Sequence, residues 1–332
     1  MLKLHEFTEN INKTQYKGKI LQHEPLSTRT TMKTGGTAEL LLVPQDPQSA
    51  IIAIGCLRNE DIPFLILGGG SNVIAPDGEL EAAVISTEAW NSISIAEETG
   101  DQVLISCGSG TKTDDLVKFC AEKGIRGLET FAGLPGTVGG ATYMNARCYG
   151  KEIADVIHGA SFIDFGDMQK NNDFCNNFIE RHLKMYHNDK SGVDWAYKNS
   201  PFMHGHYLVT SVLFKAQKAD PDAIRQVSQE CEKYILDREN KGHFKAPSAG
   251  SVFKNDRSFG EPSGSLIDKA GLKGTSIGGA QVAPWHGNII INQGNATSAD
   301  IKSLVQKVQE TVRQKNGFNL ETEILFADQI LQ

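Results

Sequence analysis

The stretch that most limits how this chain can fold runs from residue 127 to residue 150 and reads GLETFAGLPGTVGGATYMNARCYG. It holds six glycines, one proline and little charge. Glycine weakens helix and strand interiors, so we expect no regular element here. Glycine is favoured where φ is positive or where the backbone approaches another group closely. The composition predicts a buried loop whose amides face a flat ring or a pyrophosphate. A tightly packed core turn is the alternative.

A second glycine-rich loop, GGGSN at 68–72, follows the apolar run PFLIL at 63–67. Successive glycines let backbone N–H groups converge on a phosphate, and Ser71 and Asn72 add side-chain donors. The loop is not a GxGxxG turn that opens a helix, because residues 73–75 read as extended, and no GK[ST] of a P-loop follows. A plain turn between two strands is the alternative interpretation.

Charge and cysteine usage exclude several classes of protein. The net charge is −7, so we expect no nucleic-acid partner. No apolar run reaches the length of a membrane span, and the first 20 residues lack a signal-peptide core, so we expect no membrane partner. The six cysteines form no CxxC motif, which argues against a metal site or a disulfide framework and favours the cytoplasm. The oligomeric state stays open, a monomer included.

Hydrophobic periodicity predicts alternating helices and strands. The length of 332 residues allows two or three domains. We expect helices at 49–59, 113–124, 221–239 and 298–315. We expect strands at 38–43, 63–67, 159–165, 207–214 and 320–326, and three strand-like runs, AVIS, ISIA and VLIS, within 83–107. The polar segment 169–198 is expected at the surface, and a linker is expected near 216–220.

Seven motifs occur in an order that resembles one family. They are TGG at 34–36, GGGSN at 68–72, AGLPGTVGGATYMNA at 132–146, PSAGSVFKN at 247–255, LIDKAGLKG at 266–274, INQGNATSADI at 291–301 and LETE at 320–323. Together they resemble UDP-N-acetylenolpyruvoylglucosamine reductases, flavoenzymes of peptidoglycan precursor synthesis, from about residue 26 to residue 326.

The resemblance implies an α+β fold of the vanillyl-alcohol oxidase/PCMH type. Two α+β subdomains would bind FAD and a C-terminal domain would bind the UDP-sugar. We expect an N-terminal arm at 1–27, FAD subdomains at 28–95 and 96–217, and the substrate domain at 218–332. The short spacing between Ser200 and Ser251 lacks an inserted tyrosine loop, which is similar to the second of the family's two structural types.

The resemblance also implies the reaction and the cofactor site. NADPH would reduce non-covalently bound FAD, and UDP-N-acetylglucosamine enolpyruvate would be reduced to UDP-N-acetylmuramate. The nicotinamide shares the substrate pocket, so no separate motif marks a preference for NADPH over NADH. The expected FAD-binding residues are Gly68, Gly69, Gly70, Ser71, Asn72, Gly133, Pro135, Gly136, Thr137, Gly139, Gly140, Ala141 and Asn145.

Three residues match the catalytic positions of the family. Ser251 matches the proton donor, although without the resemblance a turn serine would be the better interpretation. Glu323 matches the catalytic acid, with Glu321 as a competing assignment on the same face of a strand. Lys198 stands in YKNS where the family has arginine, and it offers a point charge in place of a planar fork.

Four more residues match positions that contact the substrate: Tyr197, Lys241, Asn255 and, less closely, Gln281. His243 and Lys245 lie nearby in the sequence and could add positive charge, with ordinary solvated chain as the alternative. His286, in a turn, is expected to be structural.

Two other functions remain open on the sequence alone. One is another FAD-dependent oxidoreductase of the same fold, against which the motifs at 247–255 and 320–323 argue. The other is a non-catalytic relative that binds a UDP-sugar, which only the lysine at position 198 favours.

Overall fold

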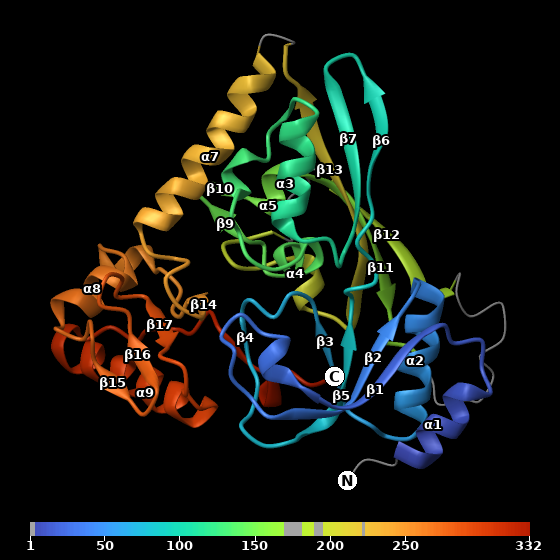
Figure 1. Cartoon of the computed structure of the whole chain (residues 1–332), viewed down its shortest axis with the longest axis horizontal. Helices are drawn as coiled ribbons and strands as arrows, with labels where there is room; N and C mark the ends of the chain where they lie inside the picture. Colours follow the sequence, from blue (N-terminus) through green and yellow to red (C-terminus); the bar gives the residue numbers. More distant parts are fainter. Residues whose placement is uncertain (1–3, 169–180, 189–194, 221–222) are drawn as a thin grey trace.

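A computed structural model describes residues 4–168, 181–188, 195–220 and 223–332. These residues form three lobes, each built on one main β-sheet (Figure 1). Most of the expected polar segment 169–198, Cys175 within it, and the expected helix start at Pro221 lie outside the described residues.

The first lobe is a four-stranded sheet in the order β1-β2-β5-β3. Its strands are β1 (Gly18–Pro25), β2 (Thr37–Pro44), β3 (Phe64–Leu67) and β5 (Leu80–Ser86), and α1 (Leu4–Asn12) and α2 (Pro47–Asn59) pack beside it. β2, β5 and β3 are parallel, and β2 is almost wholly buried, which explains its continuous apolar run. α1 and β1 belong to the segment 1–27 that was expected to be a separate arm. β1 pairs with β2 along its length, so it is part of the sheet of the first lobe.

The second lobe is an antiparallel sheet in the order β12-β11-β13-β7-β6, with β8 added beside β13. Its strands are β6 (Ile93–Thr99), β7 (Gln102–Gly108), β8 (Ile125–Arg126), β11 (Ile157–Asp164), β12 (Leu183–His187) and β13 (Tyr207–Lys218). α3 (Thr113–Glu122) and α7 (Ile224–Asn240) pack against each other on this lobe.

The position of α7 bears on the domain boundary. Its buried residues Val227 and Cys231 belong to the same hydrophobic core as the strands of the second lobe. β13 continues through residues 216–218, where a linker was expected. We therefore propose that the boundary follows α7, near Lys241, rather than preceding it.

The glycine-rich stretch is more regular than its composition predicts. It contains η2 (Glu129–Phe131), α4 (Val138–Tyr143) and β9 (Arg147–Cys148), followed by β10 (Lys151–Glu152) and α5 (Ile153–Val156). The expectation of no helix here was wrong, since α4 includes Gly139 and Gly140. Tertiary packing is the reason: a Cβ on Gly139 would lie 2.6 Å from the Cβ of Ser109, so only glycine lets this helix approach so closely.

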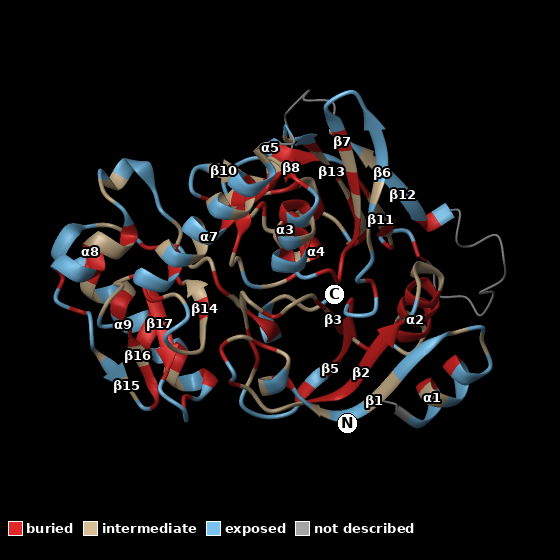
Figure 2. Cartoon of the chain, turned by 45° about the horizontal axis from the view of Figure 1, so that its top comes forward, coloured by how far each residue is buried: buried red, intermediate tan, exposed pale blue. Residues whose placement is uncertain are grey.

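The third lobe carries an antiparallel sheet in the order β14-β17-β16-β15. Its elements are β14 (Ser248–Ser251), α8 (Ser263–Lys269), β15 (Ser276–Ile277), β16 (Ala280–Val282), β17 (Ile289–Asn292) and α9 (Ser298–Asn316). The predicted apolar stripe of α9 is buried, as Figure 2 shows. A capping box between Thr297 and Asp300 starts this helix, and Gly317 with φ +74° ends it.

The chain then returns to the first lobe. β18 (Leu325–Phe326) pairs in parallel with β4 (Val73–Ile74), which follows the GGGSN loop. The strand expected at 320–326 is therefore shorter than predicted. Short 3₁₀ turns complete the fold at Leu26–Thr28, Pro201–Met203, Arg257–Phe259 and Ala327–Gln329.

Polar contacts join the third lobe to the first. The carboxylate of Asp77 accepts hydrogen bonds from the first two amides of α9, at 2.5 and 2.9 Å. Thr31 donates its hydroxyl to the carbonyl of Ser248 at 2.7 Å. Within the described residues, no helix combines the length and the apolar character that crossing a membrane requires.

Candidate functional site

A cavity of about 700 Å³ lies where the three lobes meet. This volume is within the range of about 300–1,000 Å³ that is typical of small-molecule sites. Eleven of the thirteen residues expected to bind a cofactor line it: Gly68, Gly69, Gly70, Ser71, Asn72, Gly133, Pro135, Thr137, Gly139, Gly140 and Ala141. Gly136 and Asn145 are the two that do not.

The two glycine-rich loops lie against each other along one wall. A Cβ on Gly69 would lie 2.6 Å from the Cα of Gly136, and a Cβ on Gly68 would lie 2.6 Å from Oγ1 of Thr137. Gly136 itself has φ +102° and packs against Ser71. Several glycines are therefore required by contact between the loops, which is the packed-turn interpretation. The surface that the two loops form together still faces the cavity.

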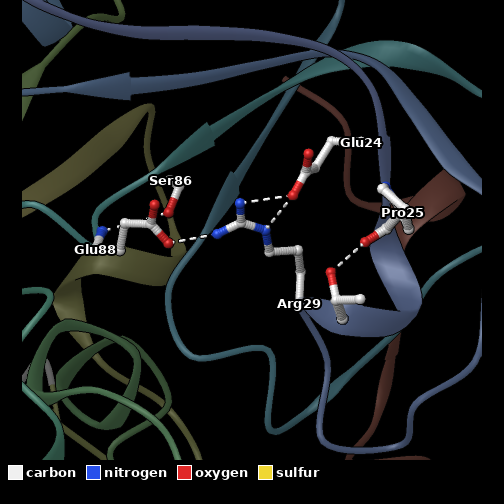
Figure 3. A network of polar contacts seen from close by, with 6 residues as sticks. Glu24, Pro25, Arg29, Ser86 and Glu88 are labelled. Atoms are coloured by element: carbon white, nitrogen blue, oxygen red, sulfur yellow. Dashed lines mark hydrogen bonds and ion pairs between the residues drawn. The ribbon is translucent and has the colours of Figure 1, made fainter.

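Gly70 packs against a segment of the first lobe that is held by ion pairs. Arg29 bonds Glu24 at 2.7 and 3.1 Å through two nitrogens and Glu88 at 2.5 Å through the third (Figure 3). Two residues on, Thr31 donates its amide to the carbonyl of Gly70 at 3.1 Å. A Cβ on Gly70 would collide with the carbonyl oxygen of Arg29. The GGGSN loop is thus fixed from behind.

We expect Gly70→Ala to destabilise the protein and lower its FAD content. Gly100→Ala is the matched control, because Gly100 has the same φ of +60° but a Cβ added to it would meet nothing within 4 Å. Both variants carry the left-handed strain of about 1–2 kcal/mol. Overpacking should lower the free energy of unfolding of Gly70→Ala by roughly 1–3 kcal/mol more than that of Gly100→Ala. Thermal unfolding would measure the stability of both variants, and the FAD-to-protein ratio would measure their cofactor content. Equal melting temperatures and equal FAD content would contradict this expectation.

The cavity wall has features that fit FAD. The hydroxyl of Ser109 is buried, borders the cavity and has no hydrogen-bond partner among the described residues. The backbone at Gly250 also borders it, and a Cβ there would meet nothing within 4 Å. A buried hydroxyl without a partner is costly, so a ligand atom that bonds it is favoured. Ser109 was not predicted, although its place between two glycines after a strand was a usable signal.

Lys198 and Glu323 meet in the cavity, although they are far apart in the sequence. Lys198 Nζ donates to Glu323 Oε1 at 2.5 Å, and each side chain is only 12% exposed. Both residues line the cavity. The ammonium and the carboxylate form a largely buried ion pair that faces the cavity.

The backbone around Lys198 is held in an unusual conformation. Lys198 has φ +56°, and Ala196 and Asn199 exchange two backbone hydrogen bonds across this turn. The hydroxyl of Ser200 donates to the carbonyl of Tyr143 at 2.6 Å. Left-handed lysine is disfavoured by about 1–3 kcal/mol and persists where the surroundings enforce it, often at functional sites.

Asn145 is one of those enforcing residues. It is fully buried and its Nδ2 donates to Glu152 at 2.9 Å and to the carbonyl of Ala196 at 2.8 Å. Its Oδ1 accepts from the amide of Ala154 at 3.1 Å. The side chain of Asn145, a residue expected to bind the cofactor, thus bonds the turn that carries Lys198.

Ser251 and Glu323 belong to adjacent segments of the same wall. Ser251 ends β14 and lines the cavity. The amide of Glu323 donates to the carbonyl of Val252, the residue that follows Ser251, at 2.8 Å. Asn72 Nδ2 donates to the carbonyl of Glu323 at 2.9 Å. These bonds link the GGGSN loop, Glu323 and Ser251 into one structure.

Glu321 lies outside the site. Its side chain is 72% exposed and pairs with Lys254 at 2.5 Å. It is not among the residues that line the cavity. The segment forms only an isolated bridge here, between Phe253 and Thr322, so the alternation of a regular strand does not bring Glu321 and Glu323 to one face.

The four residues expected to contact the substrate lie outside the cavity lining. The Tyr197 hydroxyl accepts from the Asn255 amide at 3.3 Å, and the Asn255 side chain accepts from the Ser263 amide, at the start of α8, at 2.9 Å. Lys241 pairs with Asp237 at 2.6 Å. Gln281 donates to the carbonyl of Gly274 at 3.0 Å.

The nearby basic residues contribute less charge than the sequence suggests. His243 lines the cavity, but burial, with the positive charge of Arg238, lowers the pKa of its imidazole to about 4. The imidazole is therefore neutral near pH 7. Lys245 also lines the cavity, with its ammonium over the ring of Trp285. Burial likewise lowers the pKa of His286, whose Nδ1 accepts from the Asn288 amide in its turn.

Arg238 is a cavity residue that no sequence motif indicated. It is 7% exposed, and its Nε donates to the carbonyl of Ala132 at 2.8 Å. It therefore holds the glycine-rich stretch against α7. No group of three or more metal-binding side chains occurs in the described part of the chain.

Two protein-family models match the chain. The one described as "FAD binding domain" covers residues 38–167. The one described as "UDP-N-acetylenolpyruvoylglucosamine reductase, C-terminal domain" covers residues 242–327, which starts directly after α7 and Lys241.

Curated relatives match over nearly their whole length. A UDP-N-acetylenolpyruvoylglucosamine reductase from Treponema denticola is 42% identical over 318 residues, covering 93% of this chain and 94% of the relative. The protein of that name from Borrelia garinii is 37% identical, covering 98% and 96%. The crystal structure of the enzyme from Thermus caldophilus is 26% identical, with a TM-score of 0.71 over 94% of this chain and 99% of that one.

Proposed function

The chain belongs to the family of UDP-N-acetylenolpyruvoylglucosamine reductases, and on this premise we propose how its residues share the work. It is an FAD-containing, NADPH-dependent oxidoreductase of peptidoglycan precursor synthesis with a vanillyl-alcohol oxidase/PCMH-type fold. The alternatives, another oxidoreductase or a non-catalytic binder, have no such support. When bound and reduced by NADPH, FAD would supply the hydride for reduction of the enolpyruvyl group of UDP-N-acetylglucosamine enolpyruvate.

We propose that the two glycine-rich loops hold FAD. The loop at 68–72 and residues 133–141 would surround it with backbone amides, and the Ser109 hydroxyl would give it a further hydrogen bond. Support comes from the close fit between the loops and from the unpartnered Ser109. Asn145 and Gly136 would act indirectly, by positioning the Lys198 turn and the opposite loop.

The Lys198–Glu323 pair carries the proposal for catalysis. Hydride addition to the β-carbon places negative charge on the α-carbon and the substrate carboxylate. We propose that the Lys198 ammonium offsets this charge, and that Glu323 aligns the ammonium and donates a hydrogen bond to the enolate when it carries a proton. Stabilisation of charge as it develops is commonly the largest single contribution to enzyme catalysis.

Ser251 is the proposed donor of the proton to the α-carbon. A hydroxyl is a weak acid, so it needs polarisation in a closed site. The ammonium of Lys198 can provide it, since its partner Glu323 is bonded to Val252, the residue after Ser251. Tyr197, Lys241, Asn255 and Gln281 are proposed to contact parts of the UDP-sugar that extend beyond the cavity.

An anaerobic two-step absorbance experiment tests the function. The bound flavin is reduced with one equivalent of NADPH, and UDP-N-acetylglucosamine enolpyruvate is then added. Bleaching followed by return of the oxidised band is expected. Bleaching without return would contradict the proposed second substrate. We propose that this reaction takes place in the cytoplasm, in keeping with the buried free thiols of the five described cysteines.

We expect Lys198→Arg to fold, to bind FAD and to keep turnover at or above the wild-type level. Arginine keeps the positive charge and adds a planar fork that matches a carboxylate. Turnover with substrate and the FAD-to-protein ratio would be measured together. Loss of folding or of flavin would mean that the position does not tolerate the guanidinium and that Lys198 has a different role.

A further inference from the structure

Arg147 occupies the cavity wall beside Lys198. It lies in β9 and lines the cavity with a side chain that is 35% exposed. Its Cζ is 5.8 Å from the ring centroid of Tyr197, and Lys198 Nζ is 6.0 Å from the same centroid. Two cations that line the cavity therefore each lie within 6.0 Å of the centre of one aromatic ring.

The two cations differ in how far their charge is already neutralised. Lys198 bonds Glu323 at 2.5 Å, so this pair presents little net charge to an arriving anion. Arg147 faces one carboxylate, that of Glu152, at 3.5 Å, and no hydrogen bond joins its guanidinium to another described residue. The other oxygen of Glu152 is held by Asn145 at 2.9 Å.

A guanidinium with free N–H donors in a ligand cavity can recognise an anion. It carries several donors in one plane and bonds a carboxylate through two parallel hydrogen bonds. Among the other cationic groups of the wall, Arg238 bonds the carbonyl of Ala132 and Lys245 covers the ring of Trp285, while Lys33 offers an ammonium without a planar fork.

We propose that Arg147 binds the carboxylate of the enolpyruvyl group and supplies the planar fork that Lys198 lacks. This inference rests on the proposed function. It makes Arg147 a specificity-determining residue that distinguishes the enolpyruvyl sugar nucleotide from the same sugar nucleotide without that group. Lys198 is then left to offset the charge that develops during reduction.

Calorimetric titration of the oxidised, FAD-loaded enzyme tests this assignment. Arg147→Gln should weaken binding of UDP-N-acetylglucosamine enolpyruvate about 10- to 100-fold, the range for a hydrogen-bonded charge. Its affinity for UDP-N-acetylglucosamine, which has the diphosphate but no carboxylate, should be unchanged, as should its FAD content. Unchanged affinity for the enolpyruvyl compound, or an equal loss for both ligands, would overturn the assignment.

Two further variants separate binding from a structural role. Glu152→Gln removes the ion pair of Arg147 but keeps an oxygen for Asn145, so it should not reproduce the selective loss. Arg147→Lys keeps the charge without the fork and should restore only part of the affinity. If Glu152→Gln matched Arg147→Gln, Arg147 would be structural. A wild-type enzyme that bound neither nucleotide would contradict the proposed function itself.

Discussion

Ser251→Ala is expected to accept hydride from NADPH at the wild-type rate and to lose almost all reoxidation of the flavin by substrate. The loss should be about 10²–10⁴-fold, the usual contribution of a positioned proton donor. The variant removes one hydroxyl from the end of β14 and leaves the bonds that hold Glu323 and Asn72 in place. Stopped-flow absorbance under anaerobic conditions would follow each half-reaction separately.

The conservative variant Ser251→Cys checks the interpretation. A thiol can donate a proton from the same position, so part of the reoxidation rate should return. If Ser251 had only a structural role, Ser251→Ala would also lower the rate of flavin reduction and the FAD content, together with the rate of reoxidation. Wild-type reoxidation in Ser251→Ala would remove Ser251 as the donor.

Glu323→Gln is expected to slow reduction of the substrate about 10²–10³-fold, as the loss of one group that stabilises an oxyanion does. The amide keeps the size of the side chain and can still accept from Lys198, but it cannot carry the charge or the acidic proton. Glu321→Gln is the matched control from the same segment. Its side chain is 72% exposed and pairs with Lys254, so its turnover should equal that of the wild type.

The reverse outcome would reassign the catalytic acid. If Glu321→Gln lost activity and Glu323→Gln kept it, the active conformation would have to bring Glu321 into the cavity. Flavin reduction by NADPH should stay intact in both variants. This readout separates an effect on the substrate step from a general loss of structure.

Much of the architecture follows from local sequence. The apolar stripe of α9 and its capping box predict an amphipathic helix, and the structure has one there. The helix at 113–124 and the strands at 38–43 and 63–67 likewise lie within one or two residues of their expected ends, because periodicity depends on neighbours along the chain. The GGGSN loop and most of residues 133–141 line one cavity, a joint placement that the family resemblance implied.

The errors have a common physical origin in contacts between distant segments. Gly139 and Gly140 lie in a helix because α4 packs against Ser109, which no local pattern shows. α7 packs on the second lobe because its apolar residues find their partners there.

The candidate site divides in the same way. Residue types and motif order in the sequence were enough to select Ser251, Lys198 and Glu323. Only the tertiary structure placed Glu323 in the cavity and Glu321 outside it, bonded Asn145 to the turn that carries Lys198, and brought Arg147 and Lys198 to one aromatic ring. The reason is that the residue type sets the chemistry of a side chain, and the neighbouring residues in the sequence set its local conformation. Its burial and its partners are set by segments more than 100 residues away, as in the 125-residue separation of Lys198 and Glu323.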